Sequence, residues 1–368
     1  MASRLLAKLD AAIARTRDPV QLACLRAERA GFLGRHGKVE LAQTQLKEIQ
    51  RQFADQPHVA VSGWLALAEG QIEHGSRLSH AAHDRFQRAR ALSAAAQMRP
   101  LQALSAAWLA HTEYVRCQRE RMAELCAEAL RLAAPDHHAA RWRVNLTVAC
   151  GYHFAGLMDQ AQPWYTAART HAMADGDDAA ISALIYNQAS LRGTQARWAA
   201  AFDRHCERRA VGAVISAESS GQFDAVSGVQ SLSWLGPLLR AQLLVLEGRH
   251  AEALALFDEC WPRSEPHFRA RMESVVLADR AWCLLQLDRH AEGRVDADQA
   301  LQGLQAPCDT DDRAMAQARL AQVFQQLGDE ATAASLTEAA QRDCETHRQD
   351  QRRQAALLDA ALDGITPA

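Results

Sequence analysis

The chain has 368 residues and a formal net charge of −3, from 41 lysines and arginines against 44 aspartates and glutamates. This balance argues against nucleic acid as a partner, because such binding depends on neutralising many phosphates. Hydrophobic residues make up 48% of the chain and aromatic residues only 6%. Alanine and leucine are prominent, and both are strong helix formers, so the composition predicts an all-helical protein.

The N-terminal residues and the cysteines indicate the compartment. The first ten residues lack the apolar core of a secretory signal. A first helix with Leu5, Leu6, Leu9 and Ile13 on one face is favoured over an organelle transit peptide. The chain has nine cysteines and no Cys-x-x-Cys pair, which is typical of a reducing compartment. No stretch approaches the roughly 20 apolar residues of a membrane span. We therefore expect a soluble cytoplasmic protein without a membrane partner.

Small residues recur along the chain at intervals close to 40 residues, which predicts a stacked array of helical hairpins. In each unit we expect a first helix with a small residue, a tight turn, and a second helix with a small residue four positions before a large one. The first-helix positions are Ala30, Ala68, Ala110, Ala149, Ala189, Ala241, Ala281 and Ala321. The turns are expected at Gly37, Gly75, Gly156, Gly248, Asp288 and Gly328, and also near Gln118 and Ala196. Eight hairpins follow from this segmentation.

One interval, from Ala189 to Ala241, is longer than the others by about a dozen residues. The extra residues fall in 209–234, the part of the chain that is richest in glycine and serine. We expect an irregular insertion there, which acts as a hinge or a ligand-contacting loop. The alternative is a longer hairpin or an additional helical turn that joins two half-arrays. The predicted divisions are five hairpins in 1–208, the insertion in 209–234, three hairpins in 235–345, and a capping helix and tail in 346–368.

The pattern resembles the tetratricopeptide repeat (TPR), because Gly156, Ala161, Tyr165 and Ala168 match its turn and second-helix positions in order. The resemblance implies a right-handed superhelical solenoid. The unit here is nearer 40 residues than 34, which is similar to the long-unit variety in the sensor domain of the bacterial maltose-regulon activator and in bacterial peptide-pheromone receptors.

Signatures of enzymes and cofactor sites are missing from the sequence. It contains no phosphate-binding loop, no Gly-x-Ser-x-Gly and no His-Glu-x-x-His. The fifteen histidines include the close pair His80 and His83, but a third and a fourth metal ligand cannot be placed. We therefore predict no catalytic residues, no cofactor and no metal site.

By the usual layout of the family, first helices form the concave wall, which implies a mixed polar and aromatic groove. The residues expected on this wall are Trp108, Thr112, Arg143, His153, Tyr186, Ser190, Gln242, Trp282 and Gln322. Arg29, Arg240 and Arg280 recur just before the small alanine. They form either a ladder for carboxylate or phosphate groups or ion pairs with neighbours such as Glu28 or Asp279.

These features predict a non-enzymatic scaffold or regulatory adaptor that binds a protein or peptide in its groove. The alternative is a sensor module for a small effector, such as an oligosaccharide, or for a signalling peptide, which acts on a separate output protein. An orphaned input module of a signalling enzyme is a third hypothesis. A homo-oligomer that docks through residues 355–362 is left open.

Overall fold

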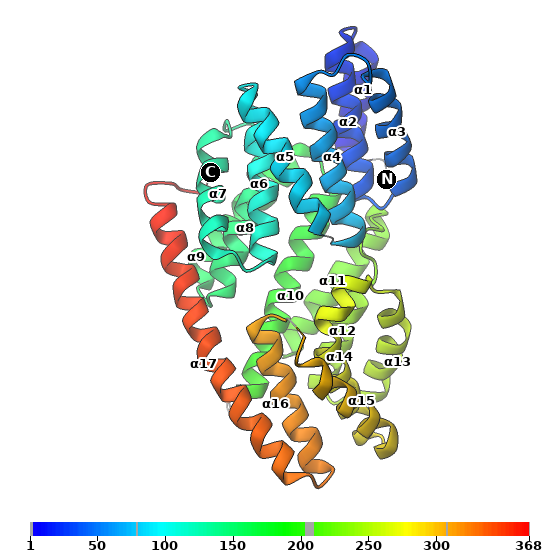
Figure 1. Cartoon of the computed structure of the whole chain (residues 1–368), viewed down its shortest axis with the longest axis vertical. Coiled ribbons are helices and arrows are strands. Elements are labelled where there is room, and N and C mark those ends of the chain that lie inside the picture. The colour runs from blue at the N-terminus through cyan, green and yellow to red at the C-terminus, as the bar shows by residue number, and fades with distance from the viewer. Residues whose placement is uncertain (1–2, 79, 203–209, 307, 368) are drawn as a thin grey trace. The chain divides into compact units, whose positions relative to one another are not determined.

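The structure is a computed structural model that describes residues 3–78, 80–202, 210–306 and 308–367. Its described residues form helices and contain no β-strand (Figure 1). The all-α prediction is therefore confirmed. The helices are α1 (Arg4–Arg15), α2 (Pro19–Arg35), α3 (Val39–Gln52), α4 (Val59–Arg77), α5 (His80–Ala95), α6 (Arg99–Val115), α7 (Arg119–Leu132), α8 (His138–Phe154), α9 (Met158–Asp175), α10 (Asp178–Phe202), α11 (Ala210–Ser227), α12 (Leu235–Leu246), α13 (His250–Cys260), α14 (Pro266–Gln286), α15 (His290–Gly303), α16 (Thr310–Gln326) and α17 (Glu330–Ala361).

Consecutive helices after α1 form the predicted succession of pairs, from α2–α3 to α16–α17. Within pairs, α2 packs on α3, α4 on α5, α6 on α7, α8 on α9, α12 on α13, and α14 on α15. First helices of successive pairs also pack on one another, as α2 does on α4, α6 on α8 and α14 on α16. Packing of each unit on its sequence neighbours is the defining feature of a helical repeat array.

The repeated alanines lie in the interfaces between helices. Ala30, Ala110, Ala149, Ala241 and Ala281 have no exposed surface. The absence of a larger side chain lets neighbouring helix backbones approach closely, and the large residues of the second helices fill the remaining space. Phe86, Tyr165 and Phe257 each follow a small second-helix residue (Ala82, Ala161 and Ala253) by four positions, and they are accordingly buried.

Most of the predicted turns adopt the left-handed conformation that a tight helix–helix connection requires. Gly156 has φ of 78° and Gly248 has φ of 72°, values that glycine adopts without steric cost. Two predicted turns were wrong. Gly75 lies inside α4, and the left-handed residue that ends this helix is Leu78, with φ of 49°. Ala196 lies inside α10, which continues to Phe202. Glycine in a helix interior costs only about 1 kcal/mol, so packing can override the local preference.

The chain divides into two compact units. Unit 1 comprises residues 1–184, 223–232 and 353–368, and unit 2 comprises residues 185–222 and 233–352. In unit 1, the largest buried side chains include Trp108, which is 1% exposed, and Trp142, which is 2% exposed. In unit 2, one core cluster includes Leu277, Leu320 and Phe324.

Two predicted segments differ from the structure. The insertion predicted as irregular contains helix α11, and only residues 228–234 are turn or irregular, while 203–209 lie outside the described residues. Its alanines and glutamate favour helix, and its glycines lower that preference without abolishing it. The predicted capping helix is the last part of α17, a continuous helix of 32 residues, because the sequence has no glycine or proline near 346 to end a helix.

None of the helices in the described parts of the chain combines the length and the apolar character that crossing a membrane requires.

Candidate ligand-binding cavity

Unit 2 contains a cavity of about 330 Å³. Four segments form its wall: the end of α10, the α12–α13 connection, the second half of α14 and the middle of α16. On α16, the lining residues Met315, Arg319 and Gln322 follow at helical spacing, so they share one face of that helix. The full lining consists of Arg197, Ala200, Ala201, Val245, Leu246, Gly248, His250, Asp279, Trp282, Met315, Ala318, Arg319 and Gln322.

A carboxylate between two guanidinium groups organises the polar side of the cavity. Asp279 is 3% exposed, and its two oxygens accept hydrogen bonds from Arg197 Nη2 at 3.0 Å and from Arg319 Nε at 3.2 Å. Each arginine donates from only one of its nitrogens in these bonds. Because two cations share one anion, these three residues leave the wall with an excess of one positive charge.

Arg319 also connects the charged and the aromatic sides of the cavity. Its guanidinium carbon lies 5.2 Å from the centroid of the Trp282 ring, within the range of a cation–π interaction. Its Nη1 donates to Gln322 Oε1 at 2.8 Å. These contacts restrict the guanidinium, so that less side-chain entropy is lost when it binds an anion.

His250 contributes a neutral polar group to the same wall. Burial lowers the pKa of its imidazole from the ordinary value of 6.5, and the nearby charge of Arg319 lowers it further. The Nδ1 atom is buried and has no hydrogen-bond partner among the described residues. A neutral imidazole can donate or accept one hydrogen bond at each nitrogen, according to its tautomer. The cavity therefore offers cationic, neutral polar and aromatic groups together.

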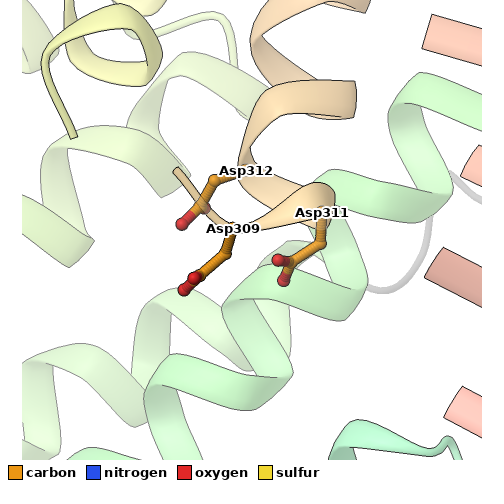
Figure 2. Close-up of side chains that lie close together, drawn as sticks. All are labelled: Asp309, Asp311 and Asp312. Atoms are coloured by element: carbon orange, nitrogen blue, oxygen red, sulfur yellow. The ribbon is translucent and has the colours of Figure 1, made fainter. Parts of the chain in front are cut away.

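Three aspartates gather at the start of α16 (Figure 2). Asp309, Asp311 and Asp312 each place a carboxylate oxygen within 4.8 Å of the others. Burial raises the pKa of both Asp311 and Asp312. The charge of Asp309 raises both further, and the charge of Asp311 adds to the rise at Asp312. Arg271 Nη1 lies 3.7 Å from Asp309 Oδ2. Protonation and Arg271 thus relieve the crowded charge, and we assign no ligand to this cluster. That the chain has no metal site stays a prediction.

The structure brings together two of the nine residues that were expected on the groove wall, because Trp282 and Gln322 both line the cavity of unit 2. Three others of unit 2 lie outside its lining. Tyr186 packs against a small apolar cluster and hydrogen-bonds to Ser190. Gln242 is 7% exposed, on α12. Membership of all nine residues in one groove stays a prediction.

The four expected groove residues of unit 1 are all buried. Trp108 and Arg143 are in contact, with the guanidinium carbon 3.8 Å from the ring centroid, and Thr112 donates to the Leu109 carbonyl at 2.9 Å. His153 differs most from the expectation, because it has no exposed surface and its Nδ1 lies 2.9 Å from the Tyr165 hydroxyl. Repeat position alone does not distinguish a groove residue from a core residue when the register shifts within a helix.

The three recurring arginines have carboxylate partners within the chain. Arg29 pairs with Asp10 at 2.6 Å, and Arg240 lies 3.4 Å from Glu218. Arg280 pairs with Asp258 and, at 3.1 Å, with Asp296. These contacts favour the alternative of structural ion pairs over a ligand-binding ladder, although the partners differ from the Glu28 and Asp279 that were suggested.

Sequence reasoning missed Arg197, Arg319 and His250 as cavity residues, and it gave Asp279 a different partner. One signal was available for Arg319. It follows Asp279 by one repeat of about 40 residues, so both occupy the same place in consecutive first helices. No comparable spacing marks Arg197, which lies in the long first helix before the predicted insertion.

The chain is similar in structure to a crystal structure of a Rap protein complexed with competence and sporulation factor. The TM-score is 0.53, and the match covers 94% of this chain and 92% of the Rap chain at 13% sequence identity. No family model and no curated protein matches the sequence. At this identity the likeness concerns the fold alone. Together with the stacked helix pairs, it shows that the chain has a TPR-like helical-repeat fold.

Proposed function

We propose that this protein is a non-enzymatic regulatory adaptor that binds a peptide segment through the cavity of unit 2. The main support for this proposal is that two guanidinium groups, an indole ring and an amide line the same cavity: Arg197, Arg319, Trp282 and Gln322. Aromatic rings supply contact area, and amides and guanidinium groups pair with backbone carbonyls and carboxylates. The similarity to a Rap protein that was solved with a bound factor supports this class of function.

The charge on the cavity wall specifies the kind of peptide. An excess of positive charge, next to a neutral imidazole, favours a ligand that brings a carboxylate to Arg197 and Arg319. The cavity of about 330 Å³ accommodates one or two side chains. We therefore propose that an acidic side chain or a free C-terminal carboxylate enters the cavity, while the rest of the peptide lies outside it.

A small-effector sensor is the second candidate function, and the cavity volume favours it. About 330 Å³ is at the lower end of the range for small-molecule sites. Such an effector would be anionic for the same electrostatic reason. An effector and a peptide differ in how much of the ligand lies outside the cavity, so direct identification of the ligand distinguishes them. The resemblance to the maltose-regulon sensor and the cytoplasmic location both stay predictions.

Selection from a random peptide library, displayed with free C-termini and captured by the full chain, tests the proposal. We expect enrichment of sequences that contain carboxylates, and loss of this enrichment in Trp282→Ala and in Arg319→Gln. Arg294→Gln is the matched control, because Arg294 forms an exposed pair with Asp298 outside the cavity. If the wild type enriches no sequence and native mass spectrometry shows a retained anionic small molecule, the peptide proposal is wrong and the effector sensor is favoured.

A further inference from the structure

Helix α1 packs on α2 and lines a small cavity in unit 1 together with the first helices of four successive pairs. Its residues Leu5 and Leu9 line a cavity of only about 20 Å³, which has room for about one water molecule. The other apolar residues of this lining come from α2, α4, α6 and α8: Phe32, Trp64, Leu104, Trp108, Ala139 and Trp142. One short helix thus closes a small cavity to which four repeats contribute residues.

Basic residues attach α1 to the end of a fifth helix. Arg4 Nη2 donates to the carbonyl of Met173 at 2.5 Å, and Lys8 Nζ donates to the carbonyls of Ala174 and Asp175 at 3.1 and 3.0 Å. These carbonyls are the last of α9, where the helix dipole places partial negative charge. The first two turns of α1 are therefore complementary in charge to the C-terminal end of α9.

Helix α1 is less embedded in unit 1 than the helices beneath it. Leu9 is its only buried residue, whereas α2 has seven buried residues and α8 has fourteen. A helix of 12 residues has little stability on its own. The next helix does not depend on α1 for its start, because the Asp18 carboxylate accepts a hydrogen bond from the amide of Gln21 at 2.9 Å. Separation of α1 would therefore leave the capping of α2 intact, while it would break the ion pair between Asp10 and Arg29.

The surface beneath α1 has the chemistry of a helix-binding groove. Trp64, Trp108 and Trp142 provide aromatic area for leucines that are spaced four residues apart. Two carboxylates, Glu28 and Asp175, line the same small cavity. Burial raises the pKa of both, so the site favours nearby positive charge or bound protons. An amphipathic helix with basic first turns matches both features.

We propose that the face of unit 1 formed by α2, α4, α6 and α8 is a helix-binding surface, that α1 occupies it as an internal ligand, and that an amphipathic helix of a partner protein displaces α1. The partner helix has basic residues in its first two turns and leucines four residues apart, as α1 does. This surface is separate from the cavity of unit 2, and the proposal does not depend on the function of that cavity.

The test uses the full chain with α1 weakened in place. Leu5→Glu with Leu9→Glu introduces two charges on the covered face of α1. Ala7→Glu with Ala11→Glu introduces the same two charges on its exposed face. The probe is a fluorescein-labelled synthetic peptide of residues 3–17, and its binding is followed by anisotropy. We expect the peptide to bind the Leu5/Leu9 variant at least tenfold more tightly than the wild type or the Ala7/Ala11 variant. Equal affinity for all three proteins would overturn the proposal.

A second measurement on the wild type keeps the proposal testable if the Leu5/Leu9 variant does not fold. Hydrogen exchange of the α1 amides is compared with that of α2 and α8 under native conditions. A displaceable helix exchanges at least tenfold faster than the helices it covers, because it opens without unfolding them. Exchange of α1 as slow as that of α2 would show that α1 belongs to the core and would refute its role as an internal ligand.

Discussion

Asp279 determines the charge of the cavity wall in unit 2, because both of its oxygens are engaged by guanidinium groups. Asp279→Asn leaves Arg197 and Arg319 without their shared counter-charge in a largely buried position. We expect the variant to lose about 2–4 kcal/mol of unfolding free energy, as measured by urea denaturation. Asp298→Asn removes the partner of Arg294 in an exposed pair, and this control should lose about 0.5 kcal/mol or less. Equal losses in the two variants would contradict the structural role of Asp279.

At the scale of residues, the register of the repeat pointed to two residues of the cavity wall in unit 2 and missed its charged residues. Trp282 and Gln322 were expected on a groove wall from their register relative to the turns, and both line the cavity of unit 2. Arg197 could not be identified in this way, because no repeat position marks it. His153 was placed in the groove by its distance from a turn, but its hydrogen bond to Tyr165 holds it in the core.

The docking of α1 can be tested at the scale of elements with two glycines of the same conformation. Gly176 and Gly156 have φ of 81° and 78°, so alanine costs about 1 kcal/mol of backbone strain at either position. A Cβ atom on Gly176 would lie 2.7 Å from Arg4 Cβ. Around a Cβ on Gly156, no described atom beyond its two chain neighbours lies within 4 Å. Gly176→Ala should therefore speed hydrogen exchange in α1, and Gly156→Ala should not. Equal exchange rates in α1 for the two variants would refute the contact.

The docking of α1 should also weaken as the pH rises. Burial, with a contribution from neighbouring carboxylates, raises the pKa of Glu28 from 4.5 to about 7 and that of Asp175 from 3.8 to about 6. Four other charged or titratable groups act on these carboxylates. The pKa is raised by Asp177, which follows α9, and lowered by Lys8 of α1, Arg35 of α2 and His138 of α8. An acid with a higher pKa in the docked state binds more protons there. Docking is therefore strongest below about pH 4 and weakens until about pH 7.

Protection factors of the α1 amides, corrected for the intrinsic exchange rate at each pH, measure this dependence. We expect them to be lower at pH 7.5 than at pH 5, and Glu28→Gln should reduce the difference. The same or higher protection at pH 7.5 would contradict burial of these two carboxylates by α1.

The sequence predicted the helix pairs well, because each pair is encoded by small residues and turn glycines that recur every 40 residues or so. It failed where the local signal was ambiguous. Gly75 suggests a turn, but α4 continues through it to Arg77. The glycine- and serine-rich segment suggests an irregular insertion or an additional helical turn, but it contains a full helix over residues 210–227. Glycine only weakens a helix, and tertiary packing decides whether the helix continues.

At the scale of the whole molecule, each of the two units contains apolar clusters of its own, and local stability should follow this division. Phe324 lies in a core of unit 2 at 1% exposure, and Phe86 is fully buried in unit 1. Replacing either by alanine costs about 3–5 kcal/mol. We expect Phe324→Ala to speed hydrogen exchange mainly in α14 to α16, and Phe86→Ala mainly in α4 to α6. A uniform increase along the chain in both variants would show one cooperative unit instead.

The central claim is that a ligand carboxylate binds to the arginines in the cavity of unit 2. A double-mutant cycle tests it most directly. Isothermal titration calorimetry measures the affinity of two peptides, the most enriched library peptide and its analogue with glutamine in place of glutamate. Each peptide is titrated into the wild type and into Arg319→Gln. We predict that each single change weakens binding about tenfold or more and that the two losses are not additive, because both remove the same contact. Fully additive losses, or unchanged affinity in Arg319→Gln, would contradict the claim.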